Sequence, residues 1–207
     1  MKHMSEYEYM VNGFLFNDFD KKTRKIRKKH DKFLDAFNST GYGDYKKRAK
    51  LARKYFKKVG KRICINKPFY CDMASNITIG DNFYSNFNLT ILDNAPVTIG
   101  NNVFIGPNVS LFTSGHPIDK DIRNSYYEFA HKIVIGNDVW IGGNVVINPG
   151  VTIGDNVVIG SGSVVTKDIP SNVVAVGNPC HVLRQITEKD KKFWENEIKR
   201  RDQAVGK

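Results

Sequence analysis

Histidine and cysteine supply the side chains of this sequence that most readily take up protons or attack carbonyl carbon, and His116 has the most suggestive setting. It lies in residues 113–117, Thr-Ser-Gly-His-Pro, where glycine and proline favour a turn. Imidazole titrates near pH ~6.5, so its neutral form is abundant near neutral pH and can accept a hydroxyl proton. His116 is therefore a side chain that could accept a proton, although a histidine taken without context is more often structural than catalytic.

The three cysteines, Cys64, Cys71 and Cys180, show no comparable pattern. Their number is odd, and none is part of a C-x-x-C pair of the metal-binding or redox type. None has a histidine or aspartate partner in a recognisable nucleophile motif. We expect no disulfide framework, no bound metal and no cysteine nucleophile.

A six-residue repeat dominates the chain from Ile77 onward and predicts the scaffold that carries His116. Aliphatic residues recur at positions 99, 105 and 111, and again at 135, 141, 147, 153, 159 and 165. This period fits no α-helix of useful length. It fits a coil with short strands as sides, each placing one aliphatic side chain in a central stack, with Gly, Asn and Asp at the corners.

The repeat is interrupted from about residue 112 to residue 131, where no aliphatic-Gly pairs occur. We interpret this stretch as a loop that projects from the coil. Loops carried on rigid scaffolds often bear functional residues, and His116 lies at the start of this one.

The N-terminal segment differs from the repeat in pattern and in charge. Apolar residues recur at three- and four-residue steps between residue 5 and about residue 60, which predicts helices. Residues 21–62 hold 18 Lys/Arg and three Asp, a net charge of +15, whereas the rest of the chain has a net charge of −4. We interpret the basic residues mainly as solvated helix surface, with attraction of an anionic ligand as the alternative, and expect no nucleic-acid partner.

Both ends of the chain also carry signals. The first residues are charged, and no stretch approaches the ~18 apolar residues of a membrane span, so we expect a soluble, cytoplasmic protein without a membrane partner. Residues 187–190 resemble a helix start, with Phe193 and Trp194 as apolar contacts of a short helix that covers the end of the coil.

The repeat resembles the hexapeptide-repeat acyltransferases, and further segments resemble their maltose/galactoside O-acetyltransferase branch. The segments are Asn-Phe-Asn at 86–88, Ile-Leu-Asp at 91–93, residues 113–117, Asp-Val-Trp-Ile-Gly-Gly at 138–143, residues 165–170 and Val-Gly-Asn-Pro at 176–179. The resemblance implies a mainly β protein, with a helical cap at 1–62, a left-handed parallel β-helix at 63–184 whose loop spans 112–131, and a C-terminal helix and tail at 185–207. It also implies a homotrimer with three active sites between subunits.

The function implied is acetyl-CoA-dependent transfer of an acetyl group to a hydroxyl of a sugar or sugar-like acceptor. Transfer would be direct, with His116 as general base and no metal. By the same resemblance, Asn86, Asp93 and Asp18 are candidate acceptor contacts, with a structural turn role as the alternative for Asp93. Asn94 occupies a further acceptor position, where the branch is expected to have an acid.

The resemblance also assigns a slot for acetyl-CoA. Its candidate residues are Trp140, Gly143, Ser161, Thr166, Lys167 and Arg184. A backbone N–H at Gly143 can act as oxyanion donor, although the galactoside enzymes have serine there.

Two alternatives stay open at this point, and a third is disfavoured. A serine- or antibiotic-type hexapeptide acetyltransferase has similar chemistry, and a non-catalytic trimeric scaffold has the same coil. A scaffold, however, needs neither His116 nor Asn86. A β-helix carbonic anhydrase is disfavoured because the separations of His116, His131 and His181, 15 and 50 residues, do not resemble its three-histidine zinc pattern.

Overall fold

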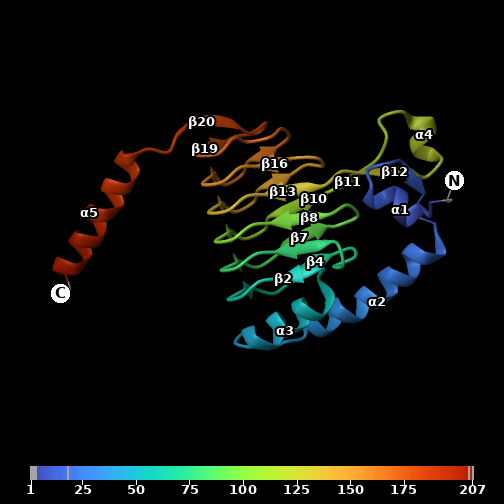
Figure 1. Ribbon diagram of the computed structural model, residues 1–207, viewed down its shortest axis with the longest axis horizontal. Helices are drawn as coiled ribbons and strands as arrows, with labels where there is room; N and C mark the ends of the chain where they lie inside the picture. The colour runs from blue at the N-terminus through green and yellow to red at the C-terminus, as the bar shows by residue number, and fades with distance from the viewer. Residues whose placement is uncertain (1–3, 18, 205, 207) are drawn as a thin grey trace.

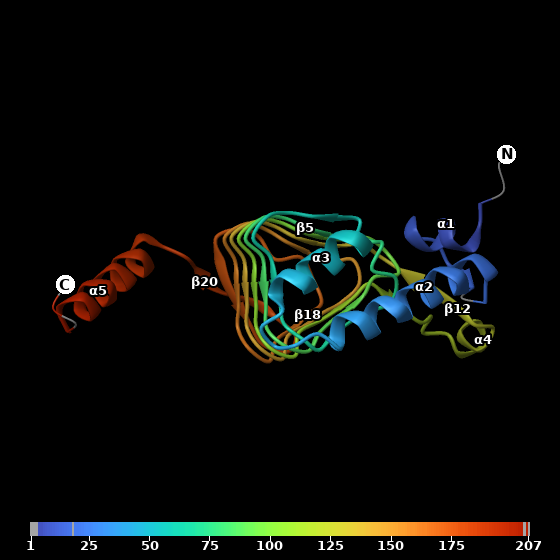
Figure 2. The same cartoon turned by 90° about the horizontal axis from the view of Figure 1, so that it is seen from below.

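The main body of the molecule is a left-handed β-helix of about six turns with a triangular cross-section. The computed structural model describes residues 4–17, 19–204 and 206. Figures 1 and 2 show the coil in two views, with helices beneath it, a loop and helix at one side, and a C-terminal helix at the other. No helix in these described residues is both long and apolar enough to span a membrane.

Three sheets of parallel strands, one of which ends in an antiparallel strand, form the sides of the coil, and the chain visits them in a fixed order. The first sheet contains β2 (Lys58–Val59), β5 (Ile77–Ile79), β8 (Val97–Ile99), β13 (Ile133–Ile135) and β16 (Thr152–Ile153). The second contains β3 (Cys64–Ile65), β6 (Tyr84–Ser85), β9 (Phe104–Ile105), β14 (Trp140–Ile141), β17 (Val158–Ile159), β19 (Val173–Val176) and β20 (His181–Gln185). The third contains β4 (Phe69–Cys71), β7 (Leu89–Leu92), β10 (Ser110–Phe112), β15 (Val146–Ile147) and β18 (Val164–Val165). We call the turn between the second and third sheets the second corner, and the turn between the third and first sheets the third corner.

The aliphatic residues of the repeat stack in register inside the coil. Ile141 pairs with Ile105 below it and Ile159 above it, and all three are at most 1% exposed. Leu111 pairs with Ile147 in the same way on the third sheet. The six-residue period was therefore interpreted correctly, but each side buries two side chains rather than the one expected, as Val139 and Ile141 show.

Asparagine and glycine allow the chain to turn at the corners with each coil close to the next. Asn82 and Asn102 have positive φ, and Asn82 Nδ2 donates to Asn102 Oδ1 at 2.7 Å, so successive turns are linked. A Cβ at Gly100 would come within 2.5 Å of the Gly136 carbonyl oxygen, which leaves space for glycine alone.

Three helices precede the coil, and two of them close its lower end. They are α1 (Glu6–Val11), α2 (Lys21–Asn38) and α3 (Tyr45–Tyr55). Phe33 and Phe37 of α2 pack against Phe56 and Phe69, with ring centroids between 5.5 and 6.4 Å apart. This aromatic cluster joins the helical cap to the aliphatic core of the coil.

Arg48 of α3 is 1% exposed and holds the turn between α2 and α3. Its guanidinium donates to the carbonyl oxygens of Ile65, Gly41 and Tyr42 and to Thr40 Oγ1, at 2.7 to 3.0 Å. These bonds satisfy a charged group that burial would otherwise destabilise.

The interruption at 112–131 is an ordered loop that contains β11 (Ser114–Gly115), α4 (Lys120–Asn124) and β12 (Tyr127–Ala130). β12 pairs antiparallel with β11 and with β1 (Phe16–Asn17) of the N-terminal segment. The three-stranded sheet fixes the loop beside the cap, at the third corner (Figure 1).

The upper end of the coil is closed differently from our expectation. β20 runs antiparallel to β19 and pairs with the edge of β19 that would otherwise be open. The predicted C-terminal helix exists as α5 (Glu188–Ala204), but it projects away from the coil (Figure 1) and none of its described residues is buried. Trp194 is 65% exposed, so the prediction that this helix covers the coil end was wrong for a single chain.

Candidate functional site

His116 lies on the wall of a hollow of about 330 Å³ beside the third corner. It directly follows β11, whose pairing with β12 carries the exposed imidazole to the rim of the projecting loop. The hollow is also lined by Phe19, Arg123, Asn124, Tyr126 and Glu128. A hollow with an imidazole and with aromatic and hydrogen-bonding side chains suits a polyhydroxylated molecule, because sugars present both apolar faces and hydroxyl groups.

The backbone on both sides of His116 is held by specific contacts. On its C-terminal side, Arg123 Nη1 donates to the carbonyl oxygens of Pro117 and Ile118, each at 3.0 Å. On its N-terminal side, a Cβ at Gly115 would meet the Phe129 ring at 2.7 Å, so glycine allows the ring to cover this strand. These contacts keep the loop in one conformation next to the imidazole.

A second concavity, a groove of about 550 Å³, lies at the second corner. It brings together four of the predicted site residues, Asn86, Trp140, Gly143 and Ser161. Its other lining residues are Tyr84, Phe104, Ile105, Gly106, Pro107 and Gly142.

Local geometry in this groove shows which polar groups it offers. Asn86 is half-buried, and its Oδ1 accepts the Phe87 N–H at 2.8 Å. The Gly143 N–H, the candidate oxyanion donor, donates to Ser161 Oγ at 3.1 Å. Trp140 is 57% exposed and provides an apolar wall.

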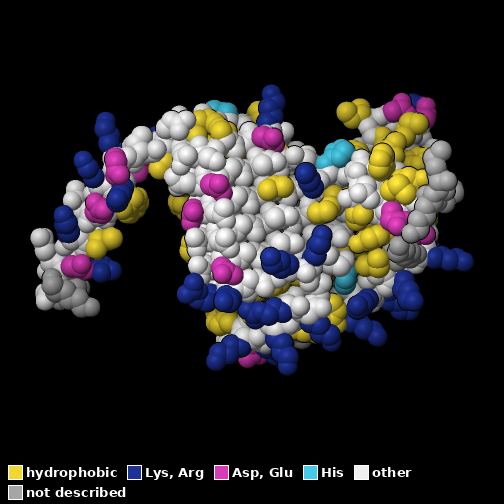
Figure 3. Space-filling model, viewed as in Figure 1, with side chains coloured by type: hydrophobic (Ala, Val, Ile, Leu, Met, Phe, Trp, Pro, Cys, Tyr) yellow, Lys and Arg dark blue, Asp and Glu magenta, His cyan; other side chains and the backbone are white. Residues whose placement is uncertain are grey.

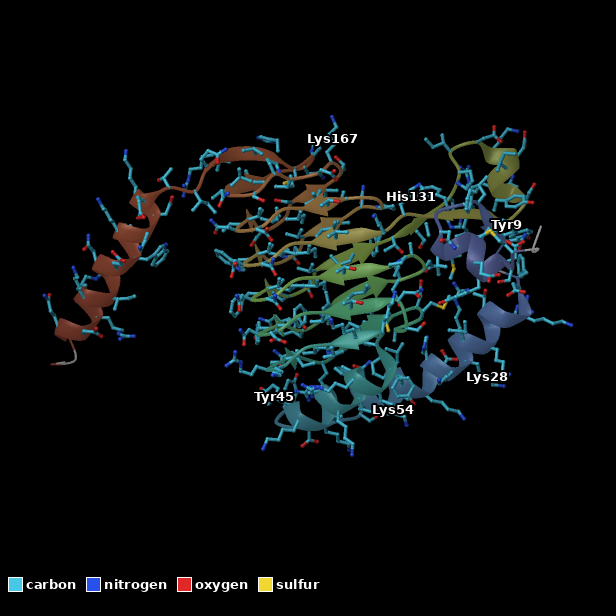
Figure 4. All side chains as sticks on the ribbon, viewed as in Figure 1. Tyr9, Lys28, Tyr45, Lys54, His131 and Lys167 are labelled. Atoms are coloured by element: carbon cyan, nitrogen blue, oxygen red, sulfur yellow. The ribbon has the colours of Figure 1, made fainter. Side chains whose placement is uncertain are left out.

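The predicted residues thus divide between two corners of one chain. Thr166 and Lys167 follow β18 and are exposed at the third corner, above the loop that carries His116. Figure 4 shows Lys167 at the upper end of the coil, with His131 at the base of the loop. Asn86, Trp140, Gly143 and Ser161 lie at the second corner, so a single chain does not bring them to His116.

Asp93 lies beneath the surface and is 0% exposed. Its Oδ1 accepts the N–H groups of Asp72 and Met73, and its Oδ2 accepts that of Asn76, at 2.8 to 3.2 Å. Burial raises the pKa of Asp93 to about 6, against the opposing effect of these hydrogen bonds. This arrangement agrees with the turn role that we considered as the alternative to acceptor binding.

The remaining predicted residues lie elsewhere. Asn94 is 1% exposed, and its Oδ1 has no hydrogen-bond partner among the described residues. Asp18 lies outside the described residues. Arg184 of β20 forms a bidentate ion pair with Asp190 of α5 at 2.6 and 2.9 Å, which holds the pKa of Asp190 well below its usual range.

Phe19, Arg123, Tyr126 and Glu128 were not found from the sequence. Arg123, Tyr126 and Glu128 lie on a segment without periodicity, and Phe19 lies between β1 and α2. The antiparallel sheet of β1, β11 and β12 brings the two segments together at His116. Within the described residues, no group of three or more His, Cys, Asp or Glu side chains is placed to hold a metal ion.

Comparison with known families agrees with the coil and its cap. Residues 132–167 match the bacterial transferase hexapeptide model, and residues 96–115 match a hexapeptide repeat of succinyl-transferase. Residues 9–60 match the maltose acetyltransferase hexapeptide capping motif. The protein is therefore a capped hexapeptide-repeat transferase.

Individual relatives specify the branch. Galactoside O-acetyltransferase of Escherichia coli is 48% identical over 197 residues, which are 95% of this chain and 97% of that protein. A solved galactoside acetyltransferase in complex with coenzyme A superposes with a TM-score of 0.88 at 48% identity, covering 91% of this chain and 94% of that one. A hexapeptide-repeat-containing acetyltransferase of Vibrio cholerae, solved with acetyl coenzyme A, gives a TM-score of 0.82 at 38% identity, covering 89% and 100%. The chain belongs to the maltose/galactoside O-acetyltransferase family, as the sequence motifs predicted.

Proposed function

We propose that this protein transfers an acetyl group from acetyl-CoA to a hydroxyl of a sugar acceptor, with His116 as general base. The observation that carries the proposal is the position of His116 on a fixed loop, in the wall of a hollow lined by aromatic and polar side chains. The acetyl-CoA and coenzyme A in the solved relatives support the identity of the donor. Because acetyl-CoA is made and used inside cells, we place the reaction in the cytoplasm.

The active form in this proposal is a homotrimer of about 70 kDa, three times the 23.5 kDa chain. The division of the site between two corners supports it, since the second corner of one chain can face the third corner of the next. Exposed aromatic side chains on the second sheet, Phe104 at 51% and Trp140 at 57%, offer an apolar contact surface. In the trimer, His116 of one subunit meets Asn86 of its neighbour.

The reaction proceeds by direct transfer. His116 removes the proton of the acceptor hydroxyl as its oxygen attacks the thioester carbonyl carbon, and the new C–O bond forms as charge collects on the carbonyl oxygen. The Gly143 N–H is the candidate donor to this oxygen, exchanging its bond to Ser161 for it. The C–S bond then breaks, and the CoA sulfur takes the proton from His116.

Replacement of His116 by alanine tests the proposal. We expect kcat to fall by ~10²–10⁴, the usual contribution of a positioned general base, with CoA affinity nearly unchanged because its contacts lie elsewhere. The assay is CoA-thiol release with a galactoside acceptor. Retention of most of the activity would contradict the role of His116, as would intact-protein mass spectrometry showing an acetylated chain that passes its acetyl group to the acceptor.

A further inference from the structure

A row of basic side chains runs along α2. Lys21, Lys25, Lys28 and Lys32 are exposed and follow one another at steps of four, three and four residues, which places them on one face of the helix. At 1.5 Å per residue the row is about 16 Å long. Figure 3 shows lysine and arginine side chains gathered along the lower margin of the molecule, over α2 and α3.

The row begins at the hollow that contains His116. Phe19 lines this hollow and packs edge-to-face on Tyr126, with ring centroids 5.0 Å apart. Arg24, in the first turns of α2, places its Cζ 5.5 Å from the centroid of Phe19. Figures 1 and 2 both show α2 starting beside α1, on the side of the coil that carries α4 and β12, and ending beneath the coil.

The row leads away from the candidate slot for acetyl-CoA. Ser161, Thr166 and Lys167 lie on the upper turns, beside β17 and β18, whereas α2 descends from the hollow to the lower end. The basic row is therefore placed to meet the acceptor rather than the donor.

Acidic groups near the row limit where negative charge can bind. Residues 21–32 include eight Lys/Arg and a single acid, Asp31, with Asp35 one turn further along α2. Glu128 lines the hollow itself, so binding of a sugar unit there is most favourable when that unit carries no negative charge. Negative groups are favoured on the units that follow it along α2.

We propose that the natural acceptor is an acidic glycan. The unit that receives the acetyl group occupies the His116 hollow, and neighbouring units with carboxylate or phosphate groups lie along Lys21, Lys25, Lys28 and Lys32. This inference rests on the proposed function and adds the chemical class of the substrate.

The test compares two trisaccharides as inhibitors of galactoside acetylation: a neutral galactose unit followed by two galacturonic acid units, and the neutral methyl ester of the same trisaccharide. We expect the acid to inhibit about tenfold more strongly at low salt. The difference should shrink near 0.1 M salt, where the Debye length is about 10 Å and exposed charges more distant than that are largely screened. Competition against a simple galactoside gives a result whether or not the trisaccharide is itself acetylated.

Two charge-matched double variants locate the effect. K25E/K28E reverses the charge at the middle of the row and should abolish the preference for the acid. The inhibition constant of the ester and the KM for acetyl-CoA should stay unchanged. K47E/K50E makes the same charge change at exposed positions of α3, and should keep the preference.

Several outcomes would overturn the inference. Equal inhibition of the unmodified protein by acid and ester would do so, as would a preference that survives in K25E/K28E. A raised KM for acetyl-CoA in K25E/K28E with unchanged preference would assign the row to the donor. Binding of an RNA oligomer or phosphatidylglycerol vesicles that K25E/K28E abolishes, again with unchanged preference, would assign it to another partner. If the protein fails to acetylate every galactoside offered, it is the proposed function that fails.

Discussion

Asp93 provides a test of how its buried carboxyl contributes to stability. Its pKa is raised from 3.8 to about 6, with burial as the main cause. The folded protein therefore holds a proton on Asp93 at pH values where the unfolded chain has lost it. The stabilisation is fully present below pH 3.8 and is lost as the pH rises through about 6.

The magnitude follows from the size of the shift. A pKa difference of about two units corresponds to about 3 kcal/mol, since one unit is worth about 1.4 kcal/mol. Asparagine carries no charge at any of these pH values. We therefore expect the free energy of unfolding of the unmodified protein, minus that of D93N, to fall by up to about 3 kcal/mol between pH 4 and pH 7.

Urea unfolding of both proteins at closely spaced pH values measures this difference. Protein concentration must be held constant, because association would add to the apparent stability. Other titrating groups are common to both proteins and cancel in the difference. A difference that stays constant, or that rises with pH, would refute the reasoning.

Two further changes test the packing and the assembly. R48M should lower the free energy of unfolding by about 3–5 kcal/mol. The substitution removes the buried guanidinium that donates to both the Ile65 carbonyl and the Thr40 hydroxyl. Chemical denaturation measures the change in the free energy of unfolding. We expect H116A and N86A each to have little activity. Mixing their subunits, after dissociation and reassembly, should raise the activity if each site takes His116 from one subunit and Asn86 from another. Mixtures that stay inactive after confirmed exchange of subunits would contradict a shared site.

The coil could be predicted from the sequence because its signal is periodic. The inward residues Ile105, Ile141 and Ile159 stack as the six-residue step requires, and no distant contact can alter that step. The direction of α5 was not recoverable, since residues 187–190 indicate a helix start but hold no information about what the helix packs on.

The candidate site was recovered in part for a similar reason. Asn86, Trp140, Gly143 and Ser161 lie on the regular turns, so their shared groove follows from the repeat. The wall of the His116 hollow, by contrast, depends on pairing between β1 and β12, which are more than a hundred residues apart in the chain. The burial of Asp93 could not be predicted from the sequence either. Its carboxyl is bound by backbone N–H groups, which every residue type except proline supplies, so the binding residues leave no sequence pattern.

The projecting loop has a consequence for how such proteins diversify. After the loop, the coil resumes in register with the turn below it. Ile133 lies opposite Val97, and Ile135 lies opposite Ile99. Residues at this corner can therefore be inserted, deleted or exchanged without repacking the aliphatic interior. Most of the wall of the His116 hollow, including Arg123, Tyr126 and Glu128, belongs to this exchangeable segment. Selection can thus alter acceptor preference at little cost to folding, which makes the corner a natural point of divergence among proteins that share the same donor slot.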